Sequence, residues 1–461
     1  MMTGVETYTP RVLIYDRKGG FGSLQKYNQL FGDETSEDPL SWDQGVSNSV
    51  GALPTHPYQQ QLDRPPGDAM DVDAADQLDE TVEVWSDFNR IFYHPRSINP
   101  INTHPINGIA RFDAYPAGCE AFRDNEKEMD TFDENFRFFA EECDQLQGFQ
   151  VLTGVDDAYG GFGAGLLDAI RSEFPKTPII TYGLSDRHED HETRRTINRA
   201  MGLTTLSDQS SLYVPLYTPQ SLNPNQHLIH PNYSLPYHTS AILSAAIETA
   251  SLPYRLKKKA WSMADMIGQL NWQGSTKLAM LSSSFPLPFS ANGYEPGFEL
   301  SLYNLSTLTQ QPSETVFGES VVARGIPTSA RGDRAAYFER LFSGFNDESS
   351  PCHQRSIVDI SYPLAHSYPR FFSSLLNDQG LISQQKQIIA PVQVPMLTHL
   401  FTGSALHESL EKEVWKLGKV QSKDLVEFNY GDFGLTREDF LETKENLISL
   451  SDAYRTDDDM M

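Results

Sequence analysis

Cysteine is scarce in this chain of 461 residues, and long apolar runs are missing. The three cysteines, Cys119, Cys143 and Cys352, form no CxxC pair. They argue against a disulfide framework and a cysteine-based zinc site, and they fit a reducing compartment. No apolar run approaches the roughly 20 residues that a membrane-spanning helix needs. Residues 1–10 have neither the apolar core of a signal peptide nor the Arg-rich character of a transit peptide.

Positive charge is also in short supply. The sequence holds 36 Lys and Arg against 62 Asp and Glu, which gives a formal net charge of −26. Such a field repels phosphate backbones, so direct binding to nucleic acid is not expected. Three catalytic signatures are missing as well, namely a P-loop GK[ST], a GxSxG nucleophile elbow and an HExxH zinc motif. His188 and His191 are three residues apart, a spacing that the polar start of a helix explains better than a metal site.

The most informative stretch has a strand, a glycine-rich segment, a helix and a second strand in succession. Residues 149–155 (FQVLTGV) predict a strand, residues 156–165 a loop, residues 166–174 a helix and residues 178–184 another strand. This order is that of a βαβ unit. It predicts a parallel sheet and an α/β domain.

The predicted loop ends in a glycine-rich segment that opens the helix. Its residues are Gly160, Gly161, Phe162, Gly163, Ala164 and Gly165. Glycines let backbone N–H groups approach an anion, and the helix dipole attracts phosphate, so the segment is a candidate phosphate site or a plain tight turn. Asp156 and Asp157 before it are candidates for holding magnesium or for capping the helix. Asp186, after the second strand, comes too early for a dinucleotide fingerprint.

Several further elements are predicted from composition and periodicity. Residues 33–80, rich in Pro, Gln, Asp and Ser, predict a disordered insertion. Residues 120–147 predict one long helix, whose buried face would hold Phe122, Met129, Phe132, Phe136, Phe139, Ala140 and Cys143. The remaining predictions are a strand at 11–16, a glycine-rich turn at 18–23, helices at 237–255 and 406–417, and a β-like segment at 387–394.

Four segments resemble tubulin. DQLQGFQ at 144–150, together with the glycine-rich segment and LLDAIRSEFPKT after it, resembles the tubulin sequence around its main phosphate-binding loop. YTPRVLIYDRKGGFGS at 8–23 is similar to a tubulin strand and its loop. GQLN at 268–271, with SSSFPLPF after it, and TGSALHESLEK at 402–412 resemble later tubulin segments in the same order. Within that superfamily, YDRKGGFGSL, VWSDFNRIFYHPRSI and YGGFGAGLLD resemble the Misato family, including its fungal members.

The resemblance implies a tubulin-like α/β fold. Residues 1–235 would form a parallel-sheet, Rossmann-like nucleotide-binding domain, residues 236–258 a central helix, and residues 259–461 a second mixed α/β domain with an acidic tail. The chain begins just after the first strand of the family pattern, which predicts a truncated N-terminus. The implied ligand is GTP or GDP with Mg²⁺. The residues that would contact it are Asp16, Gly19, Gly20, Gly160, Gly161, Phe162, Gly163, Ala164, Gly165 and Tyr237.

Several positions depart from the tubulin pattern. HPRSINPIN at 94–102 replaces a second phosphate-binding loop. Phe162 and Ala164 stand where tubulin has hydroxyl side chains, and Ala241 replaces the amide that reads guanine. Gln273 replaces the acid that activates water, and a glutamine amide is no usable base near neutral pH. These losses predict a degenerate GTPase site without efficient hydrolysis.

The resemblance to the Misato family implies a role in mitochondrial organisation, partitioning and the inheritance of mitochondrial DNA, at the cytosolic face of the mitochondrion or in the cytoplasm. Its implied partners are proteins of the mitochondrial surface, the cytoskeleton or the chaperone machinery. Three other interpretations stay open: a protein that binds no nucleotide, a GTPase whose assembly supplies the missing groups, and an adaptor in chaperone-assisted tubulin or actin biogenesis. A dinucleotide oxidoreductase ranks last, because no second catalytic constellation accompanies the glycines.

Overall fold

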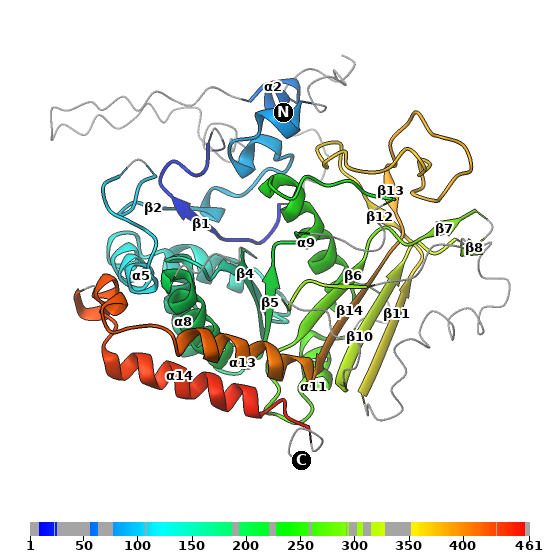
Figure 1. Cartoon of the computed structure of the whole chain (residues 1–461). Helices are drawn as coiled ribbons and strands as arrows, with labels where there is room; N and C mark the ends of the chain where they lie inside the picture. Colours follow the sequence, from blue (N-terminus) through cyan, green and yellow to red (C-terminus); the bar gives the residue numbers. More distant parts are fainter. Residues whose placement is uncertain are drawn as a thin grey trace. The chain divides into compact units, whose positions relative to one another are not determined.

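A computed structural model describes most of the chain. It covers residues 9–22, 24, 56–62, 77–106, 108–186, 193–220, 227–257, 261–291, 293–294, 302–307, 315–327, 352–429 and 431–456. Contacts between residues group the chain into two compact units. Figure 1 shows the helices and strands, coloured along the sequence. The first unit contains Met1–Arg111 and Arg123–Leu146, and the second contains Phe112–Phe122 and Gln147–Met461.

The first unit contains a short parallel sheet. Strand β1 (Ile14–Arg17) pairs with β2 (Ile98–Ile101), and Ile14 lies opposite Ile98. This confirms the strand predicted at 11–16, although the observed strand starts and ends later. The other elements of this part are α2 (Pro57–Leu62), α4 (Leu78–Thr81) and the 3-10 helices η1 (Trp85–Phe88) and η2 (Pro95–Ser97).

Helix α2 lies inside the range predicted to be disordered, and for its residues that prediction is wrong. The ring of Tyr58 is fully buried. The side-chain amide of Gln59 donates to the carbonyl oxygens of Ser86, Asp87 and Asn89 at 3.0, 3.0 and 2.6 Å. Burial of a large ring and three hydrogen bonds offset the ordering entropy of this short segment. Residues 33–55 and 63–76 lie outside the described residues.

The helix predicted at 120–147 is interrupted. The chain forms α5 (Tyr115–Met129), the π-helix η3 (Phe132–Phe136) and α6 (Arg137–Glu141). Asp130, between the first two, has a φ of 48°. The Glu126 carboxylate accepts from the backbone N–H of Phe132 at 2.9 Å and from the Thr131 hydroxyl, which stabilises the break. Phe136 and Phe139 are buried as predicted, whereas Met129 is exposed.

Two larger sheets and two small ones lie among the described residues of the second unit. Strands β3 (Phe149–Gly154), β4 (Ile179–Ser185) and β5 (Leu212–Tyr217) form a parallel sheet in that order, with helices α7 (Tyr159–Glu173) and α8 (Thr193–Gln209) between them in sequence. This confirms the predicted βαβ unit. A five-stranded sheet has the order β11 (Cys352–Val358), β10 (Val316–Arg324), β14 (Met396–Gly403), β6 (Met280–Ser284) and β9 (Tyr303–Asn304). Only the β10–β11 pair in it is parallel.

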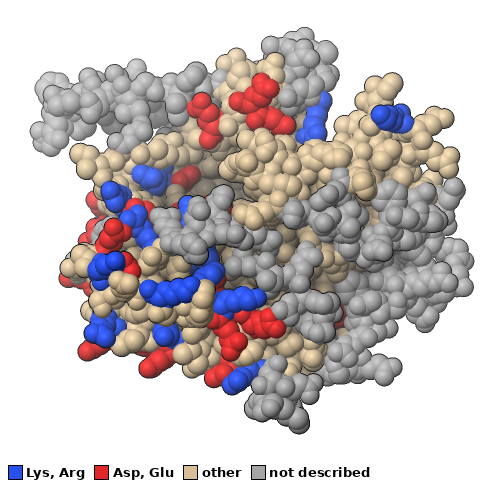
Figure 2. Space-filling model, viewed as in Figure 1, with Lys and Arg blue, Asp and Glu red and all other residues tan. Residues whose placement is uncertain are grey.

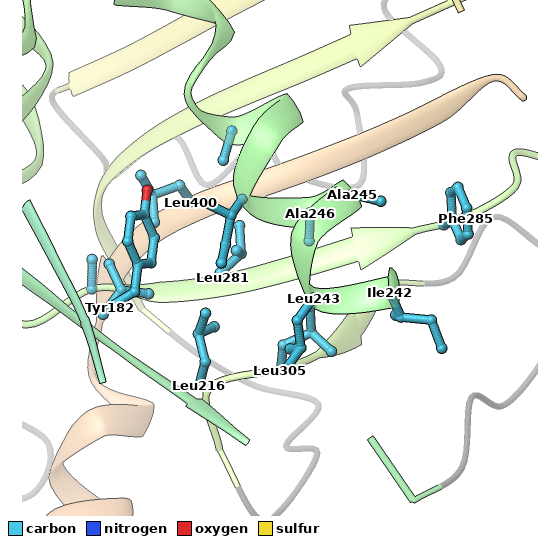
Figure 3. Close-up of a cluster of buried hydrophobic side chains, with 14 of the residues drawn as sticks. Tyr182, Leu216, Ile242, Leu243, Ala245, Ala246, Leu281, Phe285, Leu305 and Leu400 are labelled. Carbon is cyan, nitrogen blue, oxygen red and sulfur yellow. The ribbon is translucent and has the colours of Figure 1, made fainter. Parts of the chain in front are cut away.

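Helix α9 (Pro236–Ala250) is the centre of the core in this unit. Eleven of its fifteen residues are buried, as expected for a helix that is apolar on most sides. Figure 3 shows Leu243 and Ala246 beside residues of both sheets, and Ile242 belongs to the same cluster. Those neighbours include Tyr182 of β4, Leu216 of β5, Leu281 of β6 and Leu400 of β14. The shared core keeps both sheets in one unit, and the predicted domain boundaries at 235 and 259 stay a prediction.

The remaining elements follow the predictions in part. The helix predicted at 237–255 is divided into α9 and α10 (Leu252–Arg255). Helix α13 (Ala405–Leu417) confirms the helix predicted at 406–417, and α11 (Met263–Leu270) lies between them in sequence. Helix α14 (Arg437–Asp452) was not predicted, although Thr436 and Asp439 form a capping box at its start. Helices α13 and α14 pack on each other and against α8. The two small sheets pair β7 (Phe289–Ser290) with β8 (Gly293–Tyr294), and β12 (Tyr362–Pro363) with β13 (Gln393–Val394).

Among the helices that the structure describes, none combines the length and the apolar character that crossing a membrane requires.

Candidate functional site

The candidate site lies at the carboxyl end of β3, where the chain turns into α7. Strands β3 and β4 run in parallel, with Phe149 opposite Ile179 and Gly154 opposite Leu184. Their carboxyl ends therefore lie at the same edge of the sheet, which is where open α/β sheets bind ligands. Residues 155–158 form the turn between β3 and the helix.

Helix α7 begins at Tyr159, so the glycine-rich segment lies in its first two turns. The prediction of a loop at 156–165 is therefore wrong from Tyr159 onward, where the chain is helical. The backbone N–H of Tyr159 donates to the Asp157 carboxylate at 2.9 Å, which caps the helix start. Glycine disfavours a helix by about 1 kcal/mol per residue, so tertiary contacts must stabilise the helix here.

Those contacts come from the start of α5. A Cβ atom at Gly161 would overlap the carbonyl oxygen of Tyr115, and one at Gly118 would overlap that of Ala158. A Cβ at Gly165 would lie 2.5 Å from the ring of Phe122. The glycines of both helices therefore allow their backbones to approach more closely than any other residue would permit.

Aromatic rings complete this contact. Phe162 is buried and meets Phe122 edge-on, with ring centroids 5.4 Å apart. Phe112 and Tyr159 form a second edge-on pair at 5.0 Å. Gly160, Gly161, Gly163 and Ala164 are buried together with them, whereas Gly165 is half-buried. Most of the first turn of α7 is therefore buried in protein, while Tyr159 is half-buried.

Asn198 of α8 holds this arrangement closed. Its side-chain N–H₂ donates to the carbonyl oxygens of Asp113 and Asp156, both at 2.8 Å. Its side-chain oxygen accepts from the N–H of Tyr115 at 2.8 Å. Asn198 is fully buried and joins the segment before α5 to the turn before α7. Arg194, one helical turn earlier, adds an ion pair with Asp113 at 2.6 Å.

The Asp156 carboxylate is already occupied by protein donors. It accepts from the Ser185 hydroxyl at 2.7 Å, from the Asp186 N–H at 2.6 Å, and from two nitrogens of Arg199 at 3.0 and 3.2 Å. Burial raises the pKa of Asp157 to about 6. Within the described residues, no cluster of three His, Cys, Asp or Glu side chains is arranged to hold a metal ion. The acid pair proposed for magnesium is therefore engaged in structural contacts.

Arg199 extends this network to the C-terminal helices. Its guanidinium lies 3.6 Å from the Glu413 carboxylate of α13, and 5.7 Å above the ring of Tyr217. Glu413 also pairs with Lys416 at 2.7 Å. The side chains of Arg199, Asp156 and Glu413 are only 11%, 14% and 6% exposed, so water screens their charges weakly. Sequence reasoning missed Asn198 and Arg199, because only folding brings their partners together.

The predicted residues Asp16, Gly19 and Gly20 form a tight turn in the first unit. Asp16 accepts from the N–H of Arg17 at 2.7 Å and from the indole N–H of Trp85 at 3.3 Å. Gly19 has a φ of 102°, which favours glycine, and a Cβ at Gly20 would lie 2.5 Å from the Asp16 carboxylate. The structure thus explains both glycines by the turn itself, and nucleotide contact at these residues stays a prediction.

Tyr237, predicted to stack on a base, lies in the first turn of α9. It is 8% exposed, and its hydroxyl donates to the carbonyl oxygen of Ser367 at 2.6 Å. Its ring meets His238 edge-on at 5.7 Å. The hydroxyl of Tyr368 donates to the carbonyl oxygen of Ala241 at 2.9 Å, so this face of the helix is covered by protein. Base stacking at Tyr237 stays a prediction.

Gln273 occupies an exposed turn after α11. Gly274 beside it has a φ of 80°, and the indole of Trp272 donates to the carbonyl oxygen of Phe317 at 2.9 Å. Asn271 accepts from the N–H of Thr276 at 2.8 Å, which fixes the turn. The structure therefore presents a glutamine to solvent where the tubulin pattern has an acid.

A second buried polar cluster lies in the five-stranded sheet. Glu319 is fully buried, with its two carboxylate oxygens 2.8 Å from His353 Nδ1 and 2.8 Å from His399 Nε2. Burial alone would raise the pKa of Glu319, but the hydrogen bonds with His399 and His353 hold it below its ordinary value. The carboxylate is thus stabilised in its charged form as part of the sheet.

Comparison with known proteins places these features in context. A model described as a tubulin domain matches residues 74–256, and one described as the Misato Segment II tubulin-like domain matches residues 2–64. Protein dml1 of Aspergillus niger is 36% identical over 381 residues, covering 80% of this chain and 75% of that protein. Protein dml1 of Aspergillus clavatus is 40% identical over 392 residues, covering 79% and 75%. Protein misato homolog 1 of Bos taurus is 28% identical over 516 residues, covering 99% and 90%.

Proposed function

The chain belongs to the Misato family of tubulin-like proteins, and we propose that it serves mitochondrial organisation without working as a polymerising GTPase. This role includes the partitioning of mitochondria and the inheritance of mitochondrial DNA, and it is exerted through protein partners from the cytosolic face of the organelle. The family resemblance supports the proposed role in mitochondrial organisation. The packing at the start of α7 supports the absence of GTP turnover.

The closed start of α7 is the observation that carries the second part. A phosphate cradle needs several N–H groups free to donate to oxygens at about 2.9 Å. Here Gly160 and Gly161 are buried, and Gly161 packs directly on the backbone of Tyr115. Asn198 bonds Asp113 and Tyr115 on one side and Asp156 on the other. Opening the site would break these bonds, each with a net contribution of about 1 kcal/mol, and would expose two aromatic pairs. Nucleotide must therefore bind weakly if it binds here.

Nucleotide content is the direct test. We expect the purified chain to release no stoichiometric GTP or GDP on denaturation, and to bind fluorescent GTP with a Kd above about 0.1 mM, with or without Mg²⁺. The matched variant is Gln273→Glu, which restores the acid in an exposed turn without touching the core, and it should hydrolyse no GTP either. Stoichiometric, Mg²⁺-dependent GTP binding would overturn this part and return the glycine-rich segment to the phosphate-binding role predicted from the sequence.

The mitochondrial part needs a cellular test. In a fungal strain that lacks its own family member, expression of this chain should restore mitochondrial distribution and retention of mitochondrial DNA. Gln273→Glu should restore both equally well, because hydrolysis plays no part in the proposal. Gly268→Ala should also do so, since nothing lies within 4 Å of a Cβ at that position. Failure of the unaltered chain, at an expression level matched to that of a functional relative, would refute the mitochondrial role.

A further inference from the structure

Residues 386–392, here called the Ile388 loop, carry three strongly exposed aliphatic side chains ahead of β13. The exposed fractions are 103% for Ile388, 70% for Ile389 and 57% for Val392. Single exposed apolar side chains are common on soluble proteins and need no explanation. Three exposed aliphatic side chains within five residues of one loop form a concentrated apolar tip, and this tip does need an explanation.

The backbone that presents these side chains is held at both ends. The N–H of Gln387 donates to the carbonyl oxygen of Ser374 at 2.7 Å, and that of Val392 donates to the carbonyl oxygen of Asp378 at 2.9 Å. The carbonyl oxygen of Val392 accepts from Leu364 at 2.8 Å, and Pro391 between the exposed residues is buried. The isoleucines therefore project from a fixed loop, and their exposure is built into the fold.

The segment around the loop is almost free of acids. Residues 360–407 contain one acid, Asp378, although the chain has 62 acids in 461 residues. Lys386, which is exposed, is the loop's own charged side chain. In Figure 2 the surface at the upper right, where Figure 1 places β12 and β13, is tan with some blue and no red. A strongly acidic protein thus presents one apolar, acid-poor tip.

We propose that the Ile388 loop inserts into the surface of a lipid bilayer. A stable protein–protein interface buries about 800 Å² on each partner, which is far more than three aliphatic side chains at a tip can supply. A bilayer needs no matching pocket, and interfacial apolar groups reach about 5–10 Å into the headgroup and acyl boundary. The stem of Lys386 can lie along the acyl boundary while its ammonium group remains among the headgroup phosphates. Direct binding to lipid goes beyond the proposed function, which acts through protein partners.

Flotation with phosphatidylcholine vesicles tests the proposal on the purified chain. The unaltered protein should float with the vesicles, and Ile388→Ser with Ile389→Ser should lower the bound fraction at least about tenfold, because two buried aliphatic side chains are lost. Ala390→Trp, which adds an interfacial ring at the tip, should raise it severalfold. Added salt should not weaken binding, because the attraction is apolar and the protein as a whole is acidic.

The matched control is Val426→Ser on the 3-10 helix η5 (Asp424–Phe428). Val426 is 71% exposed, so it is as accessible as the loop isoleucines but lies near the C-terminal helices in sequence. Its replacement should leave flotation unchanged, and all variants should keep the thermal midpoint because every altered side chain is exposed. An unaltered protein that stays at the bottom of the gradient would overturn the proposal. Equal losses for the loop variant and the control would overturn it too.

Discussion

Replacing Gly161 with alanine is expected to destabilise the second unit by at least about 3 kcal/mol, beyond the usual range for overpacking, because the obstructing atom is backbone. The added Cβ would overlap the carbonyl oxygen of Tyr115, and the amide nitrogen of Cys119 lies 3.0 Å from it. Neither atom can move without shifting the start of α5. Urea unfolding followed by far-ultraviolet circular dichroism measures the loss as a lower unfolding midpoint.

The control for this substitution is Gly268→Ala in α11. That helical position has open space around the added Cβ, so alanine should leave the stability unchanged or raise it by up to about 1 kcal/mol through helix propensity. The two substitutions are chemically identical and differ only in what surrounds the Cβ. If Gly161→Ala were as stable as Gly268→Ala, α5 and α7 would not be packed as closely as the structure has them.

Replacing Arg199 with leucine is expected to cost about 3–5 kcal/mol, since it leaves buried charges without their partner. Leucine fills part of the same volume but leaves the Asp156 carboxylate without its cationic partner, while Glu413 keeps only its ion pair with Lys416. Asp156 would keep only the donors from Ser185 and Asp186. Thermal unfolding at neutral pH measures the loss.

Two further substitutions separate charge from packing at this position. Arg199→Lys keeps the positive charge but loses the planar fork that bonds Asp156 through two nitrogens, so its cost should be smaller than that of leucine. Lys127→Ala removes an exposed ion pair with Asp124 and should cost no more than about 1 kcal/mol. A loss for Arg199→Leu that is no larger than that for Lys127→Ala would show that the buried network contributes little.

Much of the fold could be predicted from local sequence patterns. The apolar run before the glycines, the run after Pro178 and the apolar face of α9 all indicated their elements, because burial imposes a periodicity that the sequence displays. The boundary of α7 could not be predicted in this way. Four glycines in its first seven residues disfavour a helix locally, and only the close contact with α5 offsets that cost.

Two other errors have the same origin. The composition of residues 33–80 predicts disorder, but Tyr58 is buried and Gln59 bonds residues about thirty positions away, which composition does not reveal. The apolar spacing from 120 to 147 predicts one helix, but the Glu126 side chain stabilises a break at Asp130. In each case a contact made by particular side chains overrides the average tendency of the segment.

By itself the sequence determined the family, the parallel βαβ unit, the central helix and the loss of the acid at Gln273, because motifs and periodicity are properties of consecutive residues. Only the tertiary structure decided how the glycine-rich segment packs, and phosphate binding by this segment stays a prediction. Gly161 packs against the backbone of Tyr115 and Cys119 in α5. Asn198 of α8 bonds the segment before α5, and Arg199 of α8 pairs with Asp156. Whether a helix start is open to phosphate depends on such distant groups, since backbone N–H groups bind an anion only when nothing else lies over them.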